Sequence, residues 1–122
     1  MWDADVSNNG FSQENGFALF LPQGKKYEYI DATTPEEKFD ATLRQNLFEN
    51  LTTQDDHLMQ LIGAAQSKSG KYFFTVKNSW GLAGPFKGLI QVSEAYFAIN
   101  SISLVIPKAA LSKKVLVKLK LN

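Results

Sequence analysis

The sequence contains no cysteine and no long apolar run. The absence of cysteine from its 122 residues excludes disulfides, thiolate metal sites and a cysteine nucleophile within this chain. No stretch approaches the ~18 uninterrupted apolar residues of a membrane-spanning helix, so no membrane partner is expected. Residues 1–5 carry acidic groups where a secretory signal carries basic ones, and we therefore expect no export signal.

The composition is that of one ordinary globular domain. Hydrophobic residues make up 44% and charged residues 20% of the chain, which excludes disordered, collagen-like and coiled-coil architectures. A chain of this length buries enough surface to support one core. We therefore expect a single domain over residues 1–122.

Charge is balanced overall but divided unevenly along the chain. Residues 1–60 hold 11 acidic and four basic side chains, a net charge of −7, whereas residues 61–122 hold nine lysines and one glutamate, a net charge of +8. We expect the two halves to pair with each other. The lysine-rich tail leaves polyanion binding as an alternative, but it lacks the arginines and aromatic residues of a nucleic-acid interface, so nucleic acid is not an expected partner.

The hydrophobic pattern predicts an α+β fold, with one helix followed by an antiparallel sheet or partial barrel. Thr34-Pro35-Glu36-Glu37 has the form of a capped helix start, and apolar residues at every fourth position extend that helix to about residue 50. Residues 1–24 are expected to be loop around one short strand at 17–21. Further strands are predicted at 58–65, 71–78, 88–93 and 101–106, and the alternating tail at 115–121 predicts an edge strand guarded by lysines.

His57 is the single histidine and the first candidate for chemistry. One histidine with its neighbours Asp55 and Asp56 supplies too few ligands for a metal site. Glycine-rich phosphate loops and the GxSxG serine motif are absent, so no cofactor is expected. Serine hydrolysis through Ser79 would need His57 as its base.

Asn78 is the residue that gives His57 a chemical context. His57 opens one predicted strand and Asn78 closes another; in a hairpin joined near Gly70, both would lie at the same end of the sheet. The asparagine amide can then accept the imidazole N–H and fix the ring, with Trp80 screening that bond from water. The alternative is a plain hairpin with a capping asparagine and a core tryptophan.

Two of these segments resemble motifs of papain-like cysteine peptidases, in the branch of bleomycin hydrolase and aminopeptidase C. Val76-Lys77-Asn78-Ser79-Trp80-Gly81 resembles the asparagine motif of that family, and Asp55-Asp56-His57-Leu58-Met59 resembles its histidine motif. The resemblance continues in the same order along the chain. The further matching segments are residues 3–11, 44–53, 88–97 and 101–103.

The resemblance implies a papain-like fold reduced to its right-hand, barrel-side lobe. It makes His57 the general base and Asn78 its orienting group, supported by Trp80 and Asp56. A thiolate from a cysteine-bearing half-domain outside this chain would attack the carbonyl of a peptide substrate, so the chain alone should be inactive. This branch of the family is cytoplasmic; the sequence itself leaves the compartment open.

Three situations fit this resemblance: a fragment of a longer enzyme, a subunit that joins a separate cysteine-bearing chain, or a degenerate non-catalytic homologue. A small α+β binding or interaction module without catalytic ancestry is the alternative from another class. A lone lobe leaves an apolar face uncovered, so we expect a homo-oligomer in isolation, with aromatic side chains near its contact surface. These aromatic residues are Phe73, Phe74, Trp80, Phe86, Tyr96 and Phe97.

Overall fold

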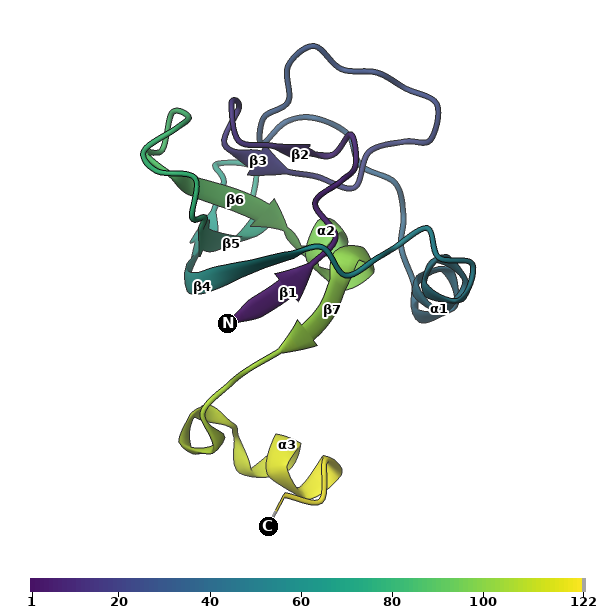
Figure 1. The fold of residues 1–122 in the computed structure, drawn as a ribbon, viewed down its shortest axis with the longest axis vertical. Coiled ribbons are helices and arrows are strands. Elements are labelled where there is room, and N and C mark those ends of the chain that lie inside the picture. Colours follow the sequence, from purple (N-terminus) through teal and green to yellow (C-terminus); the bar gives the residue numbers. More distant parts are fainter. Residues whose placement is uncertain (122) are drawn as a thin grey trace.

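A computed structural model describes residues 1–121, and Asn122 lies outside the described residues. The chain forms a curled, half-barrel sheet of seven strands accompanied by three α-helices (Figure 1). The strand order is β2-β3-β6-β5-β4-β1-β7, and every neighbouring pair is antiparallel except β3 and β6. The predicted α+β class is confirmed. The prediction of one helix is wrong, because two further helices form.

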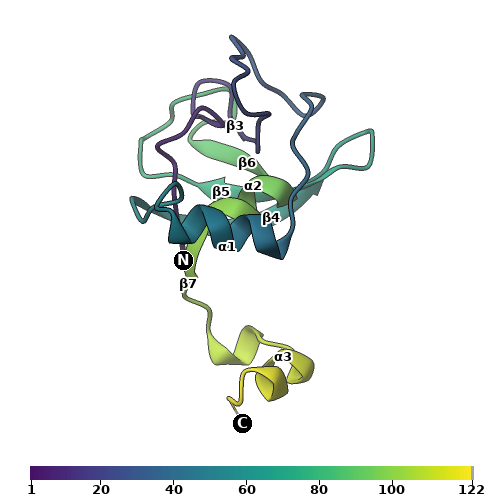
Figure 2. The same cartoon turned by 90° about the vertical axis from the view of Figure 1, so that its right-hand side faces the viewer.

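The four strands predicted between residues 58 and 106 form, with revised bounds. The strands are β1 (Trp2–Ala4), β2 (Phe11–Ser12), β3 (Phe17–Ala18), β4 (His57–Gln66), β5 (Tyr72–Lys77), β6 (Leu89–Ser93) and β7 (Ser101–Leu104). The helices are α1 (Ala41–Glu49), α2 (Glu94–Asn100) and α3 (Lys113–Lys118), with a short 3-10 helix η1 (Lys108–Ala110) before α3. Figure 2 shows α1 on the outside of the body and η1 with α3 leading away from it. No helix within residues 1–121 is long and apolar enough to cross a membrane.

The β4–β5 hairpin has the connection that the sequence predicts. Its turn spans residues 67–70, and Gly70 adopts a φ of 88°, a conformation that glycine reaches without strain. The pairing register shifts between Leu61 and Gly63, as at a β-bulge, and the first three residues of β4 extend past β5 and pair with β1. The hairpin therefore brings the start of β4 beside the end of β5.

Side chains from β1, β3, β4, β5, β6 and α2 build the core. Met59 is buried whereas its neighbour Leu58 is 56% exposed, as expected for successive positions of one strand. Phe73 and Tyr96 are buried, so their side chains offer no free surface, whereas Trp80 and Phe86 are exposed; the predicted contact surface stays a prediction. The largest buried cluster consists of Trp2, Ala4, Ala18, Met59, Val76, Ile90, Val92 and Tyr96.

Helix α1 begins later than the sequence predicts. Asp40 is its N-cap, and the Asp40 side chain accepts a hydrogen bond from the backbone N–H of Leu43 at 2.7 Å. Thr34 does not cap a helix, because its hydroxyl accepts from the backbone N–H of Asp31 instead. The predicted helix start at residues 34–37 is therefore wrong by about two turns.

Glu36 explains why that segment stays extended. Its carboxylate accepts hydrogen bonds from the backbone N–H of Phe20, at 2.7 Å, and from the hydroxyl of Ser93. It also forms an ion pair with Lys71 at 2.5 Å. The backbone N–H of Glu37 donates to the carbonyl of Phe20. These tertiary contacts replace the local capping box and fasten the segment to the sheet.

The two ends of the chain depart from their predicted structures. Residues 115–121 were predicted as an edge strand, but residues 113–118 form α3, where Ser112 caps the helix by accepting from the N–H of Val115. No neighbouring strand lies beside this segment within residues 1–121, and a helix satisfies its backbone groups locally. Strand β1 lies in the segment that the sequence predicts to be loop. The sequence does not predict it because three residues are too few to show a strand period.

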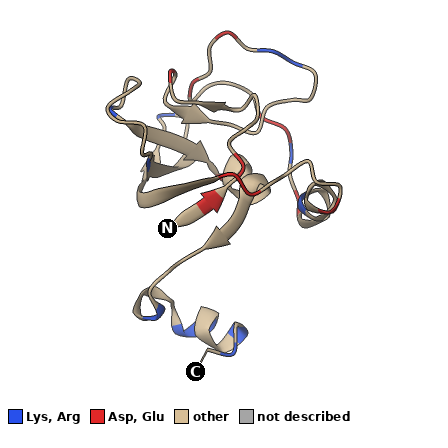
Figure 3. Cartoon of the chain, viewed as in Figure 1, with Lys and Arg blue, Asp and Glu red and all other residues tan. Residues whose placement is uncertain are grey.

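One ion pair within residues 1–121 links the acidic half of the sequence to the basic half. Across residues 1–121, the ion pair between Lys71 and Glu36 joins the basic half to the acidic half. Figure 3 shows acidic residues on β1 and on the segment before β4, while lysines cluster on η1 and α3. The expected pairing of the halves therefore rests on a single ion pair in the part of the chain that the structure describes.

Candidate functional site

The β4–β5 hairpin brings His57 and Asn78 into direct contact. His57 is the first residue of β4, and Asn78 follows the last residue of β5. The Nε2 atom of His57 lies 2.7 Å from the Oδ1 atom of Asn78, within the range for a hydrogen bond. Asn78 is buried and His57 is partly exposed. This contact matches the geometry predicted from the two strand ends, while the catalytic role of the pair stays a prediction.

The orientation of the Asn78 amide assigns the imidazole proton. The backbone N–H of Ser79 lies 2.7 Å from Oδ1 of Asn78, and a backbone N–H can only donate. The atom facing both Ser79 and His57 is therefore the amide oxygen, so Nε2 of His57 carries the proton. Nδ1 of His57 has no hydrogen-bond partner within residues 1–121 and is left as the basic nitrogen.

Gln13 holds the other side of the Asn78 amide. Nδ2 of Asn78 donates to Oε1 of Gln13 at 2.9 Å, and Nε2 of Gln13 donates to the carbonyl of Ala83 at 2.9 Å. The sequence alone does not reveal this role of Gln13. It lies 65 positions from Asn78, in a segment that the sequence predicts to be loop, and no local pattern marks it.

Trp80 packs beside the candidate pair. The centroids of the Trp80 and His57 rings are 5.1 Å apart, and Phe11 meets Trp80 edge-on at 5.8 Å. Trp80 remains 49% exposed, so it covers the imidazole from one side while bordering solvent. Trp80 thus contacts the imidazole, while its shielding of the hydrogen bond stays a prediction; the alternative of a core tryptophan is wrong.

Asp56 contacts the backbone of the N-terminal segment and makes no hydrogen bond to His57 within residues 1–121. Its Oδ1 atom accepts from the N–H of Val6 at 3.0 Å, and its Oδ2 atom accepts from the N–H of Ser7 at 3.1 Å. Asp56, the residue before the candidate base, thereby anchors the segment after β1 to the start of β4. These contacts give Asp56 a structural role.

Asp55 belongs to a second acidic contact near the start of β4. Repulsion from the neighbouring Asp3 carboxylate is the main cause that raises the pKa of Asp55 above its ordinary value, and a hydrogen bond between the two carboxyl groups adds to it. Asp3 is buried in β1, directly opposite Leu58 in the sheet register. The strand pairing therefore places a buried carboxylate close to the candidate site.

An open groove lies beside Asn78. Its volume is about 780 Å³, and its walls are largely apolar, formed by the exposed side of β4 and by the chain before β1 and after β7. A groove of this character is suited to an extended or apolar partner. The lining residues are Met1, Leu58, Met59, Gln60, Lys77, Asn78, Ser79, Val105 and Pro107.

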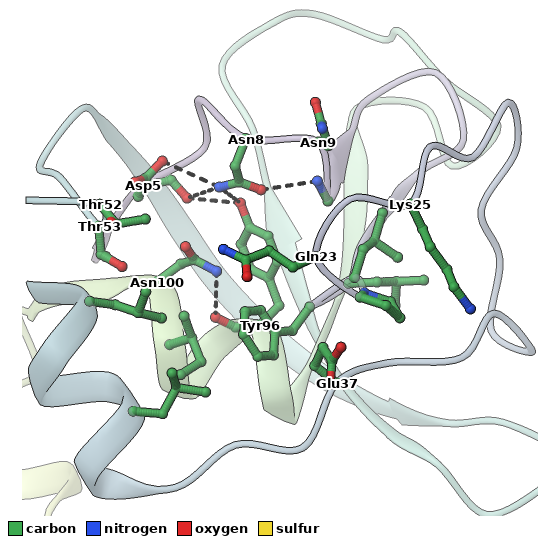
Figure 4. Close-up of a pocket in the computed structure, with 18 of the residues that line it drawn as sticks. Asp5, Asn8, Asn9, Gln23, Lys25, Glu37, Thr52, Thr53, Tyr96 and Asn100 are labelled. Atoms are coloured by element: carbon green, nitrogen blue, oxygen red, sulfur yellow. Dashed lines mark hydrogen bonds between the residues drawn. The ribbon is translucent and has the colours of Figure 1, made fainter.

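A separate cavity of about 480 Å³ lies between α1, α2 and the chain around residues 19–25 (Figure 4). Neither His57 nor Asn78 lines it. Its best-defined polar group, the Asn8 amide, donates to Asp5 and to the Tyr96 hydroxyl, so it holds the N-terminal segment in place. We assign this cavity no part in the chemistry of the candidate pair.

Within residues 1–121, no group of three or more histidine, cysteine, aspartate or glutamate side chains could hold a metal ion. No protein-family model matches the chain, and no curated protein matches it at significant similarity. The chemistry of the site must therefore be argued from its geometry. A neutral imidazole that is fixed at one nitrogen and free at the other can accept a proton from a nucleophile.

Proposed function

We propose that this chain is the histidine- and asparagine-bearing half of a papain-like cysteine peptidase of the bleomycin hydrolase and aminopeptidase C type. The observation that carries the proposal is the 2.7 Å contact between His57 Nε2 and Asn78 Oδ1, which leaves Nδ1 as the basic nitrogen. The ordered motifs around both residues and the packing of Trp80 on the imidazole add support. The substrate is a peptide.

In the proposed reaction, Nδ1 of His57 takes the proton of a cysteine thiol, and the thiolate attacks the peptide carbonyl carbon. The imidazolium then gives that proton to the leaving amine as the C–N bond breaks, leaving a thioester. Water, deprotonated by the same imidazole, hydrolyses the thioester and regenerates the thiol. Asn78 holds the ring in one direction throughout and stabilises its charged form. Because the chain has no cysteine, the thiol comes from a polypeptide segment outside these residues.

The exposed face of β4 supports the need for a covering partner. Leu58 and Ile62, four positions apart along β4, are 56% and 50% exposed, and Leu58 also lines the groove beside Asn78. Neighbouring apolar side chains on an open strand face are typical of an interface. We propose that a cysteine-bearing half-domain covers this face in the active enzyme and that, without it, copies of this chain associate.

Complementation tests the proposal directly. The chain is co-expressed with the cysteine-bearing helical lobe of a bleomycin hydrolase-type peptidase, and release of coumarin from an aminoacyl coumarin amide is measured. We expect turnover from the pair and none from the chain alone, which should also resist thiol-directed labels. His57→Ala should abolish turnover, and Asn78→Ala should lower it about 100-fold because the base loses its alignment.

Asn46→Ala provides a matched control, since Asn46 is exposed on α1 and its side chain makes no hydrogen bond within residues 1–121. This variant should keep the full rate. Full turnover by the His57→Ala pair would contradict the proposal, and so would peptidase activity of the chain alone that disappears in His57→Ala. The second result would point to Ser79 as the nucleophile.

A non-catalytic α+β interaction module is the second candidate, and the exposed face of β4 favours it. On this interpretation the chain would bind a partner through that face without restoring activity. Light scattering at micromolar concentration distinguishes the two in part. A monomer with a sharp, cooperative melt would show that the lobe stands alone and would favour a self-sufficient module.

A further inference from the structure

The N-terminal hairpin reaches the candidate site through two neighbouring side chains. Phe11, in β2, packs edge-on against Trp80, and Gln13, two residues later, accepts from the amide of Asn78. Gln13 is the first residue of the turn that joins β2 to β3. One short segment therefore contacts both residues that flank His57, although it is more than 40 positions away in the sequence.

We propose that Gln13 is a positioning residue of the candidate site, which fixes the orientation of the Asn78 amide and through it the direction of the His57 ring. The catalytic meaning of this role rests on the proposed function, whereas the hydrogen-bond geometry does not. Gln13 touches neither the imidazole nor any reacting atom; it acts through Asn78.

The direction of each hydrogen bond follows from a fixed backbone group. The carbonyl of Ala83 can only accept, so the atom of Gln13 that faces it is the amide nitrogen, and the Gln13 oxygen must face Asn78. The nitrogen of Asn78 then faces Gln13, which leaves its oxygen for His57 and for the N–H of Ser79. A chain of donors and acceptors thus runs from the backbone to the imidazole with one consistent polarity.

Gly84 holds the Ala83 carbonyl, the backbone group at which this series of hydrogen bonds begins. It adopts a φ of 82°, and a Cβ atom added there would lie 2.1 Å from the carbonyl oxygen of Gln13. The loop before β6 can therefore rest directly on the backbone of Gln13 only with glycine at this position. This close approach places the Ala83 carbonyl within reach of the Gln13 side chain.

Removing Gln13 would leave the Asn78 amide nitrogen buried and without its partner. The amide would then be held only through its oxygen, by the N–H of Ser79 and by Nε2 of His57, and it would rotate away from His57 more readily. Because the proton on Nε2 of His57 is protected by its hydrogen bond to Asn78, its exchange with water reports on the orientation of the amide.

The single histidine makes this measurement direct, since the nitrogen-15 spectrum of the labelled chain contains one imidazole. Gln13→Met removes both polar groups at nearly constant length, and Gln13→Glu keeps an acceptor for Asn78. The matched control is Gln91→Met: Gln91 is also partly buried in the sheet and bonded to one side chain, the hydroxyl of Thr75 at 3.0 Å.

We expect the Nε2 proton of His57 to exchange about tenfold faster in Gln13→Met, with a smaller change in Gln13→Glu and none in Gln91→Met. Unchanged exchange in a folded Gln13→Met chain would overturn the proposal, as would equal acceleration in Gln91→Met. If Gln13→Met does not fold, Gln13→Ala, which also lacks an acceptor for Asn78, takes its place, and exchange as slow as in the unchanged chain would then refute a positioning role. The measurement uses the chain alone, so failure of complementation would leave its outcome standing.

Discussion

Replacing Glu36 with alanine should destabilise the fold far more than replacing its neighbour Glu37. The Glu36 side chain is only 10% exposed and joins three parts of the chain: the N–H of Phe20, the hydroxyl of Ser93 and the ammonium of Lys71. Alanine removes all three contacts and leaves the N–H of Phe20 without an acceptor. The Ser93 hydroxyl keeps its bond from the N–H of Tyr96 in α2, so its loss is smaller.

The magnitude follows from these contacts. A hydrogen bond to a charged group stabilises by about 1.5–3 kcal/mol, and a partly exposed ion pair adds about 0.2–1 kcal/mol. We expect Glu36→Ala to lower the free energy of unfolding by about 3 kcal/mol, the Ser93 contact contributing least. With a urea slope of roughly 2 kcal/mol per molar, the midpoint of unfolding should fall by about 1.5 M.

Urea unfolding followed by tryptophan fluorescence and circular dichroism measures this change. Glu37→Ala is the matched control, because it alters the net charge equally while the Glu37 side chain is exposed and makes no hydrogen bond or ion pair within residues 1–121. The control should stay within about 0.5 kcal/mol of the unchanged chain. Similar losses in both variants would show that the Glu36 contacts do not hold the segment to the sheet.

Four other substitutions have defined outcomes. Because repulsion from Asp3 raises the pKa of Asp55 above its ordinary value of 3.8, the pair destabilises the fold once the pH rises through the pKa of Asp55 in the folded chain. Asp55→Asn should therefore raise the melting temperature at pH 7 and hardly change it at pH 3. A lower melting temperature of Asp55→Asn at pH 7 would contradict this. Met59→Ala should lower the free energy of unfolding, measured in urea, by about 2–5 kcal/mol, and Leu58→Ala by less than about 1 kcal/mol, because Met59 is buried and Leu58 is exposed. Equal losses in the two variants would refute the assigned faces of β4. Gly84→Ala should cost about 1–3 kcal/mol in the same assay, because its φ of 82° and the adjacent backbone oxygen exclude a methyl group; a neutral result would refute that close approach.

The sequence predicted the β4–β5 hairpin and the contact between His57 and Asn78, because both depend on local signals. Glycine-bounded strands with a turn at residues 67–70 place the two strand ends together, whatever the rest of the chain does. Trp80 follows for the same reason, being two residues beyond Asn78. Periodicity and turn chemistry act over short stretches, and a hairpin is a short-range structure.

What the sequence could not predict depends on partners far along the chain. The capping pattern at residues 34–37 was overridden by contacts of Glu36 with Phe20 and Ser93, which no local rule contains. The alternating tail became a helix because strand formation needs a neighbour that it lacks within residues 1–121. Gln13 was missed because its role exists only after the loop containing Ala83 has reached it.

The position of β1 has a consequence for how the chain folds. This strand lies between β4 and β7, and Trp2 pairs with Met59 on one side and with Leu104 on the other. The backbone of Met1 exchanges two hydrogen bonds with Val105, 104 positions away. Contacts of such long sequence separation form slowly, since a large loop must close before they stabilise anything. During synthesis β1 and the side chain of Trp2 therefore stay partly unpaired until β7 has emerged from the ribosome. In this interval exposed apolar surface is most open to aggregation, and binding by a chaperone would matter most.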